Sequence, residues 1–466
     1  MQFSSLIFVT AFLPIFLIFY KIASSSKKIS VQNAVFLCFT LLFCCFGGLR
    51  SVVVLLVVTL IGYIGGLVAE SAAESGGERR VCGVTVIILA AILAWFKYAG
   101  FIIDGVVMPA GISFYTFKMI SYVADVTRGK YEAERNPACF LIYSASFHTV
   151  MQGPIVRYDE TRKQIYDRKM TATGFAEGFY RFVIGLAKKV ILADHAGEMA
   201  GNLLPESAAV ADMPTVGIWL GMICFTLQMY LDFSAYCDMA IGLGRMLGFT
   251  YPENFDYPYM ARSVKEFWRK WHITLSSFFK DYVYIPLGGN RLGKQRRTIN
   301  LLCVWLLTGI WHGATLNFII WGLFYFAFIC LENMLQDKGY SNCPRIIGHI
   351  YTIIIFNVGW LIFRFEKFGQ LRRALAGMVG LGKGGWNNHI VKVTFSNNVF
   401  FLIVAVIACT PLMPKLRKLV ERTLRDQRKP LSAIYLCKLV ITVILFFLSL
   451  CVMTGSTYQP FLYNAF

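Results

Sequence analysis

Charged residues are scarce in this chain of 466 residues: Asp, Glu, Lys and Arg together make up 15% of it, and 57% of the residues are hydrophobic. A soluble domain has roughly 25% charged residues, so a soluble globule of this composition could not cover its apolar surface. The chain also lacks an internal repeat, a low-complexity tract and a separate soluble domain. We therefore predict an integral membrane protein whose residues 1–466 form a single membrane domain.

Metal-binding and disulfide patterns are also missing. The thirteen cysteines include no CxxC pair, and Cys38, Cys409 and Cys451 lie inside apolar runs. Such cysteines are typical of small buried hydrophobic positions. We expect no metal site and no permanently bound cofactor.

Acidic residues are outnumbered by basic ones, 26 to 45, which gives a net charge of +19. The basic residues lie in short loops between apolar runs, so the positive-inside rule explains them better than nucleic-acid binding does. Loops 21–28, 290–298 and 415–430 should be cytoplasmic. The N-terminus has no basic segment before its apolar run, which favours a retained first span with the N-terminus outside. The uncharged tail 455–466 should also lie outside.

Apolar runs long enough to cross a bilayer recur along the chain. A spanning helix needs about 20 apolar residues, and we expect an all-α polytopic protein with about 10–12 membrane helices, some of them re-entrant. Clear candidates lie near 3–20, 30–49, 51–69, 81–103, 214–235, 345–363, 398–414 and 432–454, and weaker ones near 109–124, 138–155, 174–193 and 299–331.

The stretch 299–331 has no charged residue, and its one titratable imidazole is His312 in "GIWHGATLNF". As one helix it would be about 50 Å long, which is too long for one span and short for two. A re-entrant or tightly paired hairpin that turns near Gly309 and Gly313 fits better, because glycine weakens a helix. An ionisable residue at membrane depth indicates function, and a neutral imidazole with a pKa of about 6.5 can act as a base. A structural, hydrogen-bonded histidine is the alternative.

Residues 251–298 are polar, amphipathic and rich in Trp, Tyr, Lys and Arg, which suits the cytoplasmic membrane interface. Ser263 could cap a helix that runs through Phe279, and Glu266 completes a capping-box pattern. His272 lies on this helix. A simple lipid-facing anchor helix is the alternative that composition alone favours. The apolar face would comprise Phe267, Trp271, Leu275 and Phe278.

Several motifs in this order resemble the membrane-bound O-acyltransferases, and within them the branch of bacterial alginate O-acetyltransferase membrane subunits. The resemblance covers almost the whole chain. It is carried by "MPAGISFYTFKMISYVADVTRGK" (108–130), "QGPIVRY" (152–158), "LQMYLDFSAYCDMAIGLGRMLGF" (227–249), "NFDYPYMARSVKEFWRKWHITLSSFFKDYVYIPLGGNR" (254–291), "TGIWHGATLNFIIWGLFY" (308–325), "GWLIFR" (359–364) and "PFLYNAF" (460–466).

The resemblance implies a fold with a central tunnel, with His312 as the catalytic base and His272 assisting from the cytoplasmic side. Basic residues near His272 would hold the phosphates of a coenzyme A donor, although they could serve topology alone. Asp232 and Asp238 would line the tunnel or pair with an arginine such as Arg245. The other expected substrate contacts are Trp311, Trp271, Arg269, Lys270, Asn290, Arg291, Gln152, Arg157 and Tyr158.

The resemblance further implies transfer of an acyl group, most simply acetyl from acetyl-CoA, to a hydroxyl of an extracytoplasmic polysaccharide or of a relay partner. We expect a bacterial cell membrane location, an acetylesterase-like extracytoplasmic partner that relays the group, and no nucleic acid. One alternative is D-alanyl export to teichoic acid from a carrier-protein donor. Another is a polytopic transporter, but that class would have inverted repeats or several intramembrane charges, and neither is visible.

Overall fold

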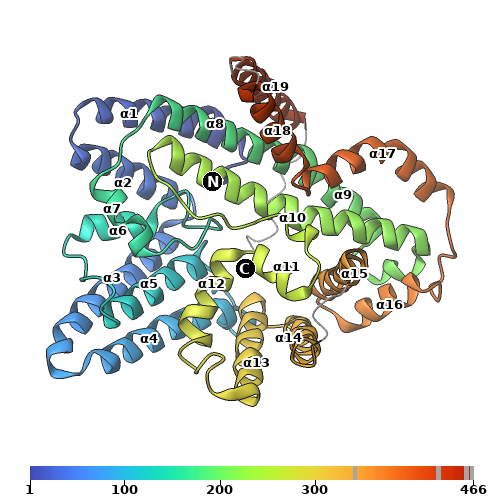
Figure 1. The fold of residues 1–466 in the computed structure, drawn as a ribbon, viewed down its shortest axis with the longest axis horizontal. Helices are drawn as coiled ribbons and strands as arrows, with labels where there is room; N and C mark the ends of the chain where they lie inside the picture. The colour runs from blue at the N-terminus through green and yellow to red at the C-terminus, as the bar shows by residue number, and fades with distance from the viewer. Residues whose placement is uncertain (340–343, 427–431, 456–460, 462–466) are drawn as a thin grey trace. The chain divides into compact units, whose positions relative to one another are not determined.

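The computed structural model describes residues 1–339, 344–426, 432–455 and 461, and all regular structure in these residues is helical (Figure 1). The C-terminal tail that the charge pattern places outside lies beyond the described residues, apart from Gly455 and Phe461. Loop 415–430 is described as far as residue 426.

Long apolar helices dominate the described chain, as the composition predicts. Eight are long and apolar enough to cross a membrane: Phe8–Ser25, Leu49–Ser75, Glu78–Phe101, Thr215–Met246, Leu316–Asp337, Arg345–Arg364, His389–Ala408 and Ser432–Gly455. The apolar helix Ile29–Cys45 is shorter. The weaker or interrupted candidate near 138–155 contains the helix α6 (Pro137–Ala145), which ends partway through that stretch. The protein is an all-α polytopic membrane protein.

The described chain divides into two compact units. Unit 1 comprises Met1–Leu186, Tyr236–Glu253 and Leu450–Phe466, and unit 2 comprises Ala187–Ala235 and Asn254–Ser449. Helix α10, Thr215–Met246, contributes to both, as does α19, Ser432–Gly455.

Unit 1 is built on close packing of helices α3 and α5. A Cβ atom at Gly62 or Gly66 of α3 would overlap the side chains of Met119 and Tyr122 of α5, so these glycines permit the close approach. The helices of unit 1 are α1 (Leu13–Ser25), α2 (Ile29–Cys45), α3 (Leu49–Ala72), α4 (Glu78–Tyr98), α5 (Ile112–Thr127), α6 (Pro137–Ala145), α7 (Tyr158–Tyr166) and α8 (Ala172–Ala187).

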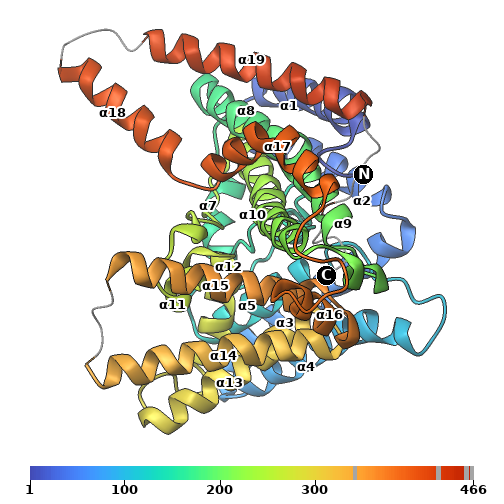
Figure 2. The same ribbon diagram turned by 90° about the vertical axis from the view of Figure 1, so that its right-hand side faces the viewer.

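Unit 2 contains the two motifs that carry His272 and His312. Most of the stretch 299–331 lies in α13, Gly293–His312, and α14, Leu316–Asp337, which run side by side (Figure 2). Gly309 and Gly322 line their contact, because a Cβ on either would meet backbone of the other helix. The remaining helices are α9 (Asp194–Leu203), α11 (Val264–Lys270), α12 (Ile273–Phe279), α15 (Arg345–Arg364), α16 (Phe368–Met378), α17 (His389–Ala408) and α18 (Leu412–Asp426).

Candidate active site

The single helix predicted from Ser263 to Phe279 is interrupted at His272. The predicted cap is present, since the Ser263 side chain accepts a hydrogen bond of 3.0 Å from the Glu266 backbone N–H. The Glu266 carboxylate instead accepts from the backbone of Arg262, at 2.9 Å. At His272 the backbone is left-handed, with φ 44° and ψ 55°, so α11 ends before it and α12 begins after it.

Asn254 explains this interruption. Its carbonyl oxygen accepts a 2.9 Å hydrogen bond from the backbone N–H of Ile273. Its side-chain Oδ1 accepts from the backbone N–H and the hydroxyl of Thr274, at 3.1 and 2.9 Å. Asn254 therefore caps the first turn of α12 from a distant part of the chain. Sequence reasoning missed this residue, because no local pattern links it to the helix.

The same Oδ1 atom fixes the proton of His272. It lies 3.1 Å from Nδ1 of the imidazole. Because a backbone N–H donates to this Oδ1, the atom must be the amide oxygen, so Nδ1 of His272 must be the donor. Burial lowers the pKa of His272 to about 3, so the ring is neutral near pH 7. Its other nitrogen, Nε2, then carries the lone pair and can accept a proton or a hydrogen bond.

His312 is the last residue of α13 and is followed by Gly313, which ends the helix. The side chain is buried, with 5% exposed. Its ring lies against three aromatic rings of the same unit: the centroid distances are 4.6 Å to Trp311, 4.8 Å to Trp321 and 5.2 Å to Phe363. A neutral imidazole in this aromatic shell can take a proton.

Trp311 joins the two histidines. Its ring centroid is 6.5 Å from that of His272 and 4.6 Å from that of His312. Unit 2 therefore brings together three of the predicted site residues, namely His272, Trp311 and His312. Trp271, a fourth, packs on Trp360 at 4.7 Å in the same aromatic cluster.

The apolar face of α11 and α12 is buried in protein. Phe267 and Trp271 are fully covered, and α11 packs against α14 and α15. A lipid-facing anchor helix, which composition alone favours, is therefore wrong. Residue pattern could not decide this, because a face that meets lipid and a face that meets a protein core have the same periodicity.

The basic residues expected to hold donor phosphates are mostly exposed and partly engaged elsewhere. Lys270 forms an ion pair of 3.1 Å with Glu266. Lys294 and Arg297 share Asp337, at 3.5 and 2.7 Å. The remaining predicted polar contacts of this region, Arg269, Asn290 and Arg291, are exposed, and Asn290 accepts a hydrogen bond from Tyr284.

Three predicted substrate contacts belong to unit 1. The backbone N–H of Arg157 donates to Glu160 at the start of α7, at 2.8 Å. The hydroxyl of Tyr158 donates to Glu134. Gln152 is buried, and its carbonyl oxygen accepts from the thiol of Cys237 at 3.9 Å. These contacts lie within unit 1 and hold its structure together.

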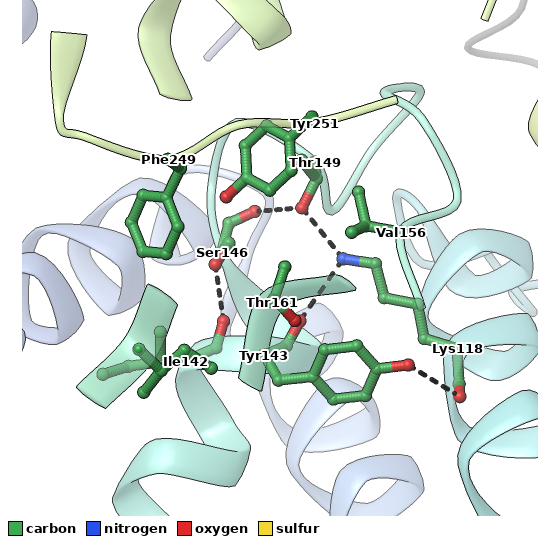
Figure 3. A pocket seen from close by; sticks show the side chains of 10 residues that line it. Lys118, Ile142, Tyr143, Ser146, Thr149, Val156, Thr161, Phe249 and Tyr251 are labelled. Atoms are coloured by element: carbon green, nitrogen blue, oxygen red, sulfur yellow. Dashed lines mark hydrogen bonds between the residues drawn. The ribbon is translucent and has the colours of Figure 1, made fainter. Parts of the chain in front are cut away.

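Unit 1 also contains a polar pocket around Lys118, which sequence reasoning missed although a lysine inside the apolar run 109–124 could have signalled it. The Lys118 ammonium donates to the Thr149 hydroxyl at 2.9 Å and to the Tyr143 carbonyl at 3.4 Å (Figure 3). Phe249 and Tyr251 close the pocket. Within the described chain, no carboxylate forms an ion pair with this buried lysine.

The two aspartates of α10, Asp232 and Asp238, form ion pairs. Asp232 lies 2.7 Å from Lys189 in unit 2, and Asp238 lies 2.9 Å from Arg181 in unit 1. Asp238 thus pairs with an arginine, as expected, but with Arg181 and not with Arg245, which pairs with Glu177. In the parts of the chain that the structure describes, no three His, Cys, Asp or Glu side chains are grouped so as to hold a metal ion.

Comparison with known proteins decides the family. The family model of the membrane-bound O-acyltransferases matches residues 134–363, which include both histidines. A protein of Azotobacter vinelandii described as a probable alginate O-acetylase is 36% identical over 400 residues, 82% of this chain and 79% of its own. The chain belongs to the membrane-bound O-acyltransferase family. The predicted family and the prediction of an O-acyltransferase are thus confirmed.

More distant relatives of this family member differ in the group they transfer. A peptidoglycan O-acetyltransferase of Helicobacter pylori is 29% identical over 423 residues, 81% of this chain and 80% of its own. A teichoic acid D-alanyltransferase of Bacillus subtilis is 26% identical over 275 residues, 55% of this chain and 69% of its own. The similarity thus extends further along the chain for the acetyltransferases.

Proposed function

We propose that this O-acyltransferase moves an acetyl group from a cytoplasmic thioester, acetyl-CoA, to a hydroxyl of an extracytoplasmic polysaccharide in the bacterial cell membrane. The observation that carries the proposal is the buried pair His272 and His312, joined through Trp311. The relatives that match most of the chain are described as acetylases of alginate and of peptidoglycan, which favours acetyl and a polysaccharide.

His312 acts as the general base in this proposal. An alcohol is a weak nucleophile near pH 7, so its proton must leave as the oxygen attacks the thioester carbonyl carbon. A neutral imidazole takes that proton, and the resulting imidazolium returns it to the departing thiolate. Such a proton transfer contributes typically about 10²–10⁴-fold to the rate.

His272 acts as a hydrogen-bond acceptor rather than as a donor. A lone pair on Nε2, which the bond from Nδ1 to Asn254 favours, cannot bond to the carbonyl oxygen of the thioester. It can accept from an amide N–H of the pantetheine arm or from the acceptor hydroxyl. In this proposal His272 holds the pantetheine arm of the donor through such a hydrogen bond.

The proposal also includes an orientation of the chain in the membrane and a partner protein outside the cell membrane. The N- and C-termini lie outside, and the basic loops, including residues 290–297, face the cytoplasm and the anionic donor. The chain passes the acetyl group to an acetylesterase-like extracytoplasmic partner, which delivers it to the polymer. Affinity purification from native membranes tests this relay, and recovery without any such protein contradicts it.

Turnover in proteoliposomes tests the donor and the base. Radiolabelled acetyl-CoA is supplied on the side of the basic loops, and wild type is compared with His312→Gln and with His349→Gln. His349 is a matched control, because its Nδ1 hydrogen-bonds to the backbone carbonyl of Ala261 at 3.0 Å. We expect loss of turnover in His312→Gln alone. Turnover of a D-alanyl carrier protein but not of acetyl-CoA would instead support the D-alanyl transfer known from the more distant relatives.

A further inference from the structure

Two side-chain N–H donors on α14 are buried without an acceptor. Asn317 is 1% exposed and Trp321 is 0% exposed. Across the described residues, neither the Asn317 Nδ2 amide nor the Trp321 Nε1 indole finds a hydrogen-bond partner. Burying a donor without an acceptor costs stability, so such a group in a well-packed region calls for an explanation.

The Trp321 donor belongs to a ring that contacts His312, and the Asn317 donor lies one helical turn before it on α14. Asn317 and Trp321 are four residues apart on one helix, so they share a face one turn apart. The ring of Trp321 meets that of His312 edge to face, with centroids 4.8 Å apart and planes at 78°. Phe318, which lies next to Asn317, also stacks on His312, at 6.4 Å. One unpaired donor thus belongs to a ring packed on the residue that acts as base, and the second lies on the same helix face one turn away.

The helical hairpin holds these donors in place. Gly309 of α13 and Gly322 of α14 leave no room for a Cβ atom, which shows that the two helices are in close contact. Trp321 is further packed by Trp268 at 5.4 Å and Tyr325 at 5.2 Å. Donors that are fixed before the reaction stabilise developing charge without having to reorganise.

We propose that the Asn317 amide and the Trp321 indole form the oxyanion hole of the acyl transfer, an inference that rests on the proposed function. As the acceptor oxygen bonds to the thioester carbonyl carbon, His312 takes the hydroxyl proton and the carbonyl π electrons move to its oxygen. That oxyanion accepts hydrogen bonds from Asn317 and Trp321. It then reforms the carbonyl, the carbon–sulfur bond breaks, and the thiolate takes the proton from His312.

This assignment complements the roles of the two histidines. His312 accepts a proton as the base, and His272 has its lone pair on Nε2. Neither imidazole therefore donates a hydrogen bond to the carbonyl oxygen of the thioester. Amide and indole N–H groups have no basic lone pair of their own, so they remain donors at every pH at which the enzyme is folded. They therefore supply what neither histidine offers.

Trp360 provides a matched control. Its indole N–H is also buried without a partner among the described residues, and its side chain is fully covered. Its ring packs on Trp271 at 4.7 Å and on Phe363 at 5.9 Å, and none of its described ring contacts involves His312. Removing its N–H tests the general effect of losing an indole in this cluster.

The experiment compares Trp321→Phe, Asn317→Leu and Trp360→Phe in proteoliposomes, with kcat and KM measured for the thioester that wild type turns over. We expect kcat to fall about 10²–10³-fold in each of the first two variants, with KM within about threefold, and both constants to stay near wild type in Trp360→Phe. Infrared spectra of acetyl-CoA labelled with ¹³C at the carbonyl should show a lower stretching frequency when it is bound to wild type, and a smaller shift with Trp321→Phe.

The outcomes separate the two proposals. If wild type turns over neither acetyl-CoA nor a carrier-protein thioester, the proposed function is wrong. If wild type is active but Trp321→Phe and Asn317→Leu both behave like Trp360→Phe, the oxyanion hole is wrong and the proposed function stands. Should a variant fail to fold, the carbonyl frequency on wild type still decides, because an unshifted band contradicts the assignment.

Discussion

The amide oxygen of Asn254 accepts a hydrogen bond of 3.1 Å from Nδ1 of His272, 18 residues along the chain. One residue thereby caps α12 and sets which imidazole nitrogen carries the lone pair. The helix break and the chemistry of the candidate site thus have the same physical cause.

Replacing Asn254 with leucine should strongly destabilise the protein. The change leaves three buried donors without an acceptor, namely His272 Nδ1 and the backbone and hydroxyl of Thr274. Each such loss costs about 1–3 kcal/mol. Asn388→Ala is the control, because this exposed asparagine caps α17 through one bond of 2.9 Å to Val391, and a single cap costs about 1 kcal/mol. Melting temperatures in detergent that fall equally in both variants would contradict the role of Asn254.

The left-handed backbone of His272 predicts which substitutions the fold accepts. Asparagine adopts φ values near 44° more readily than alanine does. His272→Asn should therefore melt at a higher temperature than His272→Ala, although both lose the imidazole. Activity should fall in both variants, mainly through a higher KM for the donor. Equal melting temperatures would show that backbone conformation does not limit this position.

The low pKa of His272 predicts acid destabilisation. In the folded protein burial lowers this pKa to about 3, whereas an unfolded histidine titrates near pH 6.5. The unfolded state therefore binds more protons between these values, so stability falls as pH drops below about 6.5. The decrease in melting temperature from pH 7.5 to pH 5 should be smaller in His272→Asn than in wild type. An identical decrease would mean that His272 binds a proton equally well in both states.

Lys118 in the pocket of unit 1 should tolerate loss of its charge better than loss of its volume. With no described carboxylate to pair with it, the buried ammonium gains little from Coulomb attraction. Lys118→Met keeps most of the side-chain length and should change the free energy of unfolding by less than about 1 kcal/mol. Lys118→Ala leaves a cavity and should lower it by about 2–5 kcal/mol. Thermal unfolding of both variants checks this. A methionine variant as unstable as the alanine variant would point to a required charge.

Much of the fold and part of the site follow from local pattern. The apolar runs predict most of the long helices, and Gly313 after His312 marks the end of α13 because glycine disfavours helix there. The break at His272 is not predictable in this way, since its cause, Asn254, lies outside the helix. The unpaired N–H donors of Asn317 and Trp321 could likewise not be predicted from the sequence, because whether a donor finds an acceptor depends on how the helices pack. The pairing of Lys294 and Arg297 with Asp337 joins residues from two helices, which no single loop reveals.

The most direct test of the account is single-turnover acetyl transfer by His312→Gln, with wild type and His349→Gln measured beside it at equal, folded protein levels. We predict that the single-turnover rate constant of His312→Gln is at least about 10²-fold lower than that of wild type, while that of His349→Gln remains close to wild type. Wild-type turnover in His312→Gln would contradict it and make that histidine a structural residue of the α13–α14 hairpin.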